Sequence, residues 1–156
     1  MRRVFALLAT LLVLAVVAQF FLTASGAFDT APNEESFQPH RALGYMTFLL
    51  AVLLTIVAAL ARMPGRLIGM TSLVAGLIVV QVVIAVLARA FNDTGDTSTT
   101  AGQLVFGLHA INGLIILAVA GTLARRARAL SRSAVTDRPA GAGNHAGVSG
   151  PAQPAS

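Results

Sequence analysis

The chain contains no cysteine, and its 11 basic residues are all arginine. The absence of cysteine excludes disulfides, thiol redox chemistry and metal sites with cysteine ligands. It also excludes the quinone-coupled four-helix enzymes that make disulfides, because those enzymes need pairs of cysteines. Arginine without lysine, together with abundant alanine, valine and leucine, is typical of a protein from a high-GC bacterial genome.

Acidic residues are also scarce, with only 6 in 156 residues, and none lies in a long apolar run. A proton-coupled exporter needs a carboxylate inside the membrane, so this function is disfavoured. The serines and acids do not form the elbow or triad frame of a hydrolase with a histidine. We therefore assign no catalytic residue from the sequence.

Apolar residues dominate instead: 56% of the chain is hydrophobic and the mean hydropathy is +0.78. Four runs approach the roughly 20 apolar residues that cross a bilayer. The predicted helices lie at about 4–24, 38–61, 67–89 and 102–124. Because the runs are continuous rather than alternating, they predict helices and not a barrel. The fold class is therefore all-α, an integral membrane four-helix bundle over residues 1–132.

Charge is distributed unevenly between the two ends of this bundle. One end carries Arg2, Arg3, Arg62, Arg66, Arg125, Arg126, Arg128, Arg132 and Arg138. The other end has only Arg41 and Arg89, with Asp29, Glu34, Glu35, Asp93 and Asp96. The positive-inside rule then predicts a multi-pass protein of the cell membrane with both termini in the cytoplasm. The pI near 11.6 reflects this topology, so nucleic acid is not a predicted partner.

The two terminal segments need separate consideration, because each could lie outside the helical bundle. Residues 1–27 resemble a signal peptide, but their apolar run is about 18 residues long, beyond the usual 7–15, which favours an uncleaved helix. Residues 133–156 are rich in Ala, Gly, Pro and Ser and predict a disordered cytoplasmic tail. His145 lies in this tail and receives no function. The cluster Arg125–Arg132 is predicted to anchor the topology or to touch anionic lipid.

Two histidines stand in matching frames 69 residues apart. Phe37–Gly44 and Phe106–Gly113 both read F-x-x-H-x-x-x-G and lead into apolar runs. The match indicates a 2+2 pseudo-repeat in which the two helix pairs share one orientation. Because ionisable side chains inside a bilayer are costly, His40 and His109 are candidate functional residues.

Small and polar residues recur along the second predicted helix at intervals of three or four. They are His40, Gly44, Thr47, Ala51, Thr55 and Ala58. Such a stripe is predicted to face the other helices, because small residues let backbones approach. Ser36 is predicted to cap this helix, and Thr100–Gln103 reads as a capping box for the fourth.

A pair of imidazoles facing one bundle is a simple way to hold haem, since two neutral histidines can occupy both axial positions of the iron. A glycine one turn from each histidine would give the porphyrin room, and arginines near the outer surface would pair with its propionates. The candidate metal ligands are His40 and His109. The candidate cofactor-binding residues are His40, His109, Arg41, Arg89, Gly44 and Gly113, and the expected cofactor is haem b.

The segment His40-Arg41-Ala-Leu-Gly44 resembles the His-Arg-x-x-Gly segment on the second helix of one half of a haem A synthase. That family is a tandem of two four-helix units with histidines on the even helices, and His109 would be similar to the partner of His40. Glu34 and Glu35 are not in the frame of that family's acidic residue, so oxidation of a haem methyl group is not implied. The overall pattern also resembles small actinobacterial four-helix membrane proteins of unknown mechanism.

The resemblance and the frames imply a haem protein for electron transfer or haem handling near the outer face. The alternative is a non-catalytic membrane subunit or assembly factor with structural histidines. In that case His40 is an interfacial residue, and His109 bonds Gln81, Gln19 or Asn112 and only fixes the packing.

Counting residues from the cytoplasmic arginines places the two histidines at unequal depths. His40 is 22 residues before Arg62 and His109 is 16 before Arg125, a mismatch of about 9 Å at 1.5 Å per residue. If it holds, one subunit cannot supply both ligands and a homodimer would be needed. The predicted partners are therefore the lipid bilayer and either a second copy or another membrane subunit.

Overall fold

The computed structural model describes residues 1–92 and 99–136, and all the regular structure within them is helical. The elements are α1 (Arg2–Ala27), α2 (Asn33–Ser36), α3 (Gln38–Leu60), α4 (Gly65–Asn92) and α5 (Thr100–Thr136). Within these ranges, four segments are long and apolar enough to cross a membrane, which confirms the predicted fold class. The predicted tail lies outside the described residues from 137 onward.

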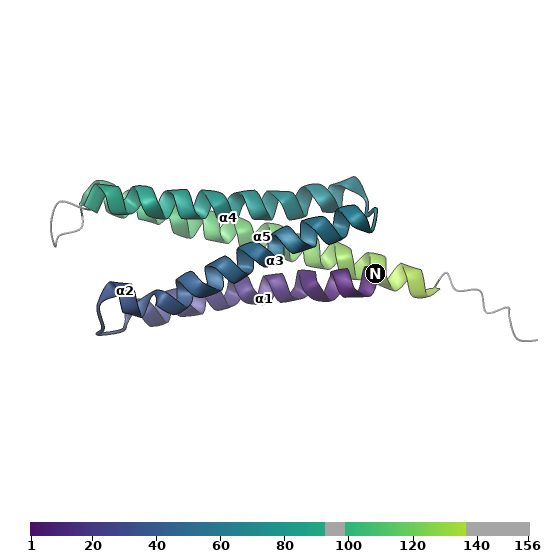
Figure 1. Cartoon of the computed structure of the whole chain (residues 1–156), viewed down its shortest axis with the longest axis horizontal. Coiled ribbons are helices and arrows are strands. Elements are labelled where there is room, and N and C mark those ends of the chain that lie inside the picture. The colour runs from purple at the N-terminus through teal and green to yellow at the C-terminus, as the bar shows by residue number, and fades with distance from the viewer. Residues whose placement is uncertain (93–98, 137–156) are drawn as a thin grey trace, which may run out of the picture.

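The four long helices form a bundle in which α3 and α5 cross (Figure 1). At the end that carries α2, α1 runs beside α3 and α4 beside α5. At the opposite end, α3 lies along α4 and α5 lies along α1. The crossing therefore creates two helix pairs, α1–α3 and α4–α5, at the end with α2.

Two helix starts differ from the sequence prediction. Ser36 is the last residue of α2, and its hydroxyl donates to the carbonyl of Ala31 at 2.9 Å instead of capping α3, so that prediction is wrong. The cap of α5 is Thr99, whose hydroxyl accepts the Gly102 amide at 3.0 Å. The capping residue thus precedes the predicted capping box by one position. Both Thr99 and Thr100 are suitable caps, because a threonine hydroxyl can accept a backbone amide of the first turn.

The turn between α3 and α4 ends the helix in a left-handed residue. Arg62 has a φ of 49°, and the Met63 amide donates to the Ala58 carbonyl at 2.9 Å. This bond satisfies a carbonyl of the last helical turn in the manner of a Schellman motif. The side chain of Met63 is buried, so the same turn closes the end of the core.

The packed core occupies only the half of the bundle near this turn. It is built from Phe5, Ala9, Leu12, Leu54, Leu67, Val74, Leu123, Ala124 and their neighbours. Thr47, Ala51 and Ala58 are buried, so the inner part of the predicted small-residue stripe does face other helices. Nearer α2, by contrast, no side chain is buried in residues 17–25, 38–46, 79–87 or 103–111. The bundle is thus tightly packed at one end and loosely packed at the other.

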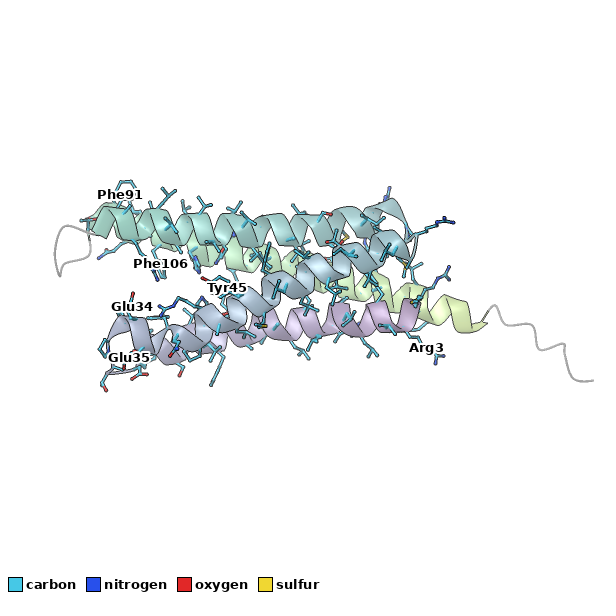
Figure 2. All side chains as sticks on the ribbon, viewed as in Figure 1. Arg3, Glu34, Glu35, Tyr45, Phe91 and Phe106 are labelled. Atoms are coloured by element: carbon cyan, nitrogen blue, oxygen red, sulfur yellow. The ribbon has the colours of Figure 1, made fainter. Side chains whose placement is uncertain are left out.

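Charged residues separate along the bundle as the sequence predicts. Figure 2 shows Arg3 at the end with the α3–α4 turn, and Glu34 and Glu35 at the end with α2. Helix α5 continues 12 residues past its predicted end at 124, to Thr136, so Arg125, Arg126, Arg128 and Arg132 are helical. Arg126 lines a surface hollow together with Leu73, well inside α4. The first arginines of α5 therefore lie deeper in the bundle than Arg62.

Candidate histidine site

The rings of His40 and His109 meet between the two helix pairs. Their centroids are 6.2 Å apart and their planes are inclined by 52°. His40 lies in the first turn of α3 and His109 in the third turn of α5. The predicted depth mismatch is therefore wrong, because Arg62 and Arg125 do not mark the same level of the bundle.

Nδ1 of His40 is held by α1. It lies 3.3 Å from the carbonyl oxygen of Gln19 and 3.0 Å from the hydroxyl oxygen of Thr23. The Thr23 hydroxyl itself donates to the Gln19 carbonyl at 2.8 Å. Since that hydroxyl proton is already used, both oxygens can only accept from the ring, and Nδ1 is the protonated nitrogen.

Nδ1 of His109 is held in the same way by α4. It lies 3.2 Å from the carbonyl oxygen of Gln81, which can only accept, so this Nδ1 is also the protonated nitrogen. The Gln81 side chain returns a bond, because its Nε2 donates to the His109 carbonyl at 2.8 Å. Asn112 completes the network: its Nδ2 donates to Oε1 of Gln81 and to the Leu77 carbonyl, the latter at 2.9 Å.

Both imidazoles therefore carry their lone pair on Nε2, the nitrogen remote from the bonded carbonyl. Within residues 1–92 and 99–136, neither Nε2 has a hydrogen-bond partner. Metal-ligating histidines adopt this arrangement, in which a carbonyl bound to one ring nitrogen fixes the other for the metal. In both rings, Nε2 is therefore the nitrogen left to accept a further partner.

The protein offers few further ligands near this pair. In the part of the chain that the structure describes, no three or more His, Cys, Asp or Glu side chains gather to hold a metal ion. A metal on His40 and His109 would need to bring additional ligands of its own. Haem iron meets this need, because the porphyrin supplies its equatorial ligands.

Aromatic rings lie against the histidines. Phe106 is parallel to the His109 ring, with centroids 5.3 Å apart, and Phe37 meets His40 edge-on at 6.5 Å. Figure 2 shows Phe106 and Tyr45 projecting into the region between the two helix pairs. Their exposed fractions are 49% and 64%, so neither ring is enclosed by the protein.

Side chains of α1 occupy the space beside the two glycines that the sequence singled out. A Cβ on Gly44 would lie 3.3 Å from Nε2 of Gln19, and a Cβ on Gly113 would lie 3.3 Å from the Phe20 ring. In this structure the absence of a Cβ at Gly44 and Gly113 therefore lets Gln19 and Phe20 pack closely against α3 and α5. Oε1 of Gln19 is buried without a hydrogen-bond partner in the described chain, which leaves an unpaired acceptor next to His40.

The structure places the two candidate arginines at the correct end but not on the rings. Arg41 follows His40, and its guanidinium donates to the backbone carbonyl of Glu34. Arg89 is exposed and lies eight residues beyond Gln81 on α4, about 12 Å nearer the loop. Both arginines therefore lie between the two histidines and the loops at the α2 end of the bundle, and neither contacts an imidazole ring.

Replacing Asn112 by leucine is expected to destabilise the α4–α5 pair by about 1–2 kcal/mol, because interhelical polar bonds in membranes are worth about that much. Thr55→Val is the matched control, since the Thr55 hydroxyl bonds only the Ala51 carbonyl of its own helix. Thermal unfolding in detergent measures both. Equal effects of the two changes would contradict a role for Asn112 between helices.

Comparison with known proteins gives one match. Residues 19–89 are similar to DUF6220, a family of unknown function. This match covers less than half of the chain and includes His40 and Gln81 but not His109. No curated protein and no solved structure matches the chain. The comparisons therefore show no relationship to the haem A synthases.

Proposed function

We propose that this protein is a haem-binding membrane protein in which His40 and His109 of a single chain would both hold the iron of haem b. The observation that carries the proposal is the spacing of the two rings. Metal–imidazole bonds are about 2 Å long, so two imidazoles on opposite sides of one metal have centroids about 6 Å apart. The two rings here are 6.2 Å apart.

The loose packing around the pair supports this assignment. Residues at the same level on all four helices are half-buried or exposed, whereas the core below them is closed. A porphyrin between the helix pairs would bury this apolar surface. Phe20 would have to leave its contact with Gly113, and Phe106 would then pack against the porphyrin ring.

The charges support an orientation of the site in the cell membrane. The arginine-rich end would lie in the cytoplasm with both termini, so the histidines would lie near the outer face. Arg41 and Arg89 would be available there for the haem propionates through charge-assisted hydrogen bonds. We infer that the protein acts in electron transfer or haem handling at that face.

Bound haem would supply reversible one-electron chemistry. The chain would hold it: carbonyls of Gln19 and Gln81 fix the imidazoles, and apolar side chains limit access of water. Because each histidine is fixed by its neighbouring helix before any ligand binds, ligation would require little reorganisation of the two rings.

The direct test is a reduced-minus-oxidised absorption spectrum of detergent-purified protein made with added haem precursor. The proposal expects sharp reduced α and Soret bands. A featureless spectrum would overturn it and favour the second candidate function, a non-catalytic membrane subunit. The hydrogen bonds that Gln81 makes with α5 support that alternative, because they would fix the packing without any cofactor.

A further inference from the structure

Two adjoining surface hollows lie at the arginine-rich end, between the start of α4 and the last turns of α5. Their volumes are about 360 and 310 Å³. The first is lined by Arg66, Gly69, Met70, Leu73 and Arg126. The second is lined by Pro64, Arg66, Leu67, Arg126, Ala129 and Leu130. Arg66 and Arg126 thus border both hollows, one from each helix.

The two arginines have no counterion in the described protein. Neither makes an ion pair or a hydrogen bond within residues 1–92 and 99–136. Every acidic residue in those ranges (Asp29, Glu34 and Glu35) lies at the opposite end of the bundle. Two exposed guanidiniums therefore face the same hollows without a carboxylate to neutralise them.

The walls of the hollows are apolar. Leu73 and Met70 continue from the arginines along α4 toward the middle of the bundle, and Leu73 is 50% exposed. A Cβ at Gly69 would meet no atom within 4 Å, so this glycine leaves the hollow open. An anion alone would use only the arginines, whereas a lipid would also cover the apolar walls.

We propose that this surface binds an anionic phospholipid, with the phosphate on Arg66 and Arg126 and an acyl chain along Gly69, Met70 and Leu73. Basic pockets between transmembrane helices on the cytoplasmic side bind anionic head groups. Guanidiniums suit this role because they form bidentate hydrogen bonds with phosphate oxygens. The site is independent of the histidine pair, at the other end of the bundle.

Native mass spectrometry of the full chain in detergent tests the charge requirement. The probes are phosphatidylglycerol, phosphatidylcholine with the same acyl chains, and glycerol phosphate. Each arginine near an anionic head group is worth about fivefold in affinity, so Arg66→Gln/Arg126→Gln is expected to weaken phosphatidylglycerol binding roughly thirtyfold. Arg125→Gln/Arg128→Gln is the control, because it removes equal charge from residues that do not line the hollows.

A second pair of variants tests the apolar walls without changing charge. Gly69→Leu fills the first hollow and is expected to displace phosphatidylglycerol. Gly76→Leu is the control, since that glycine lies on the same helix, is also open, and does not line the hollow.

Preference for phosphatidylglycerol over phosphatidylcholine, lost in both test variants and kept in both controls, would establish the site. Equal binding of the two lipids, or equal loss in test and control variants, would overturn it. Glycerol phosphate binding as tightly as the lipid would also overturn it, since the apolar walls would then contribute nothing.

Discussion

Replacing either His40 or His109 by alanine is expected to abolish the sharp α band of the reduced protein. A sharp reduced α band needs two strong-field ligands on the haem iron, so loss of one imidazole is expected to leave a high-spin haem with a broad spectrum. Absorption spectra of the purified variants measure this directly. We expect the two variants to behave alike, because the structure places both rings at the same site.

His145→Ala is the matched control, since this histidine lies outside the described residues and receives no function. It should keep the full spectrum. The size-exclusion profile of each variant separates loss of ligation from loss of the fold. A well-folded His109→Ala protein with an unchanged α band would contradict the assignment of that ligand.

Replacing Gly26 by alanine is expected to destabilise the protein by about 1–3 kcal/mol, the usual cost of adding atoms where packing is close. The new Cβ would lie 2.8 Å from the Ser36 carbonyl oxygen and 3.2 Å from the Phe37 ring. Because the first neighbour is backbone, α2 must shift. Phe37 would shift too and would alter its edge-on contact with His40.

Gly76→Ala is expected to stabilise the protein rather than destabilise it. A Cβ at Gly76 meets no atom within 4 Å, and alanine is favoured over glycine in a helix by up to about 1 kcal/mol. Thermal unfolding in the same detergent compares the two variants. If Gly26→Ala were as stable as Gly76→Ala, the close approach of α1 to α2 would be refuted.

The sequence predicts the bundle well because a bilayer allows so few alternatives. The four apolar runs are enough to predict four helices. The uneven distribution of arginines predicts which turns lie at the same end of the bundle. The length of α5 was not predicted, because the sequence prediction ended that helix where the apolar run ends. The segment after Leu123 is rich in Ala, Arg and Leu, which are strong helix formers, and this composition was the available signal.

The histidine pair was predicted, and Gln81 was one of the three partners named for His109, but the bond between His40 and Gln19 was not predicted. The Gln19–His40 and Gln81–His109 bonds are equivalent in the two helix pairs, yet they span 21 and 28 residues. Gln19 and Gln81 are 62 residues apart in the chain, whereas the two histidines are 69 apart, so a search at one fixed offset finds the histidines and misses the glutamines.

The depth of the two histidines was wrong for a different reason. A count from the nearest arginine assumes that arginines mark the end of each helix. Arg62 does so, because it ends α3 in the left-handed turn. Arg125 is followed by three more turns of α5, so it marks no helix end. A count of residues from the nearest arginine therefore does not measure depth in this bundle.

The central claim is that one chain holds one haem between its own two histidines. The most direct measurement is the ratio of haem to protein in a monodisperse sample, with the electron paramagnetic resonance spectrum of the oxidised form. The account predicts a single haem per chain and a low-spin signal typical of two imidazole ligands. A haem shared between two chains, a high-spin signal, or no bound haem would contradict it.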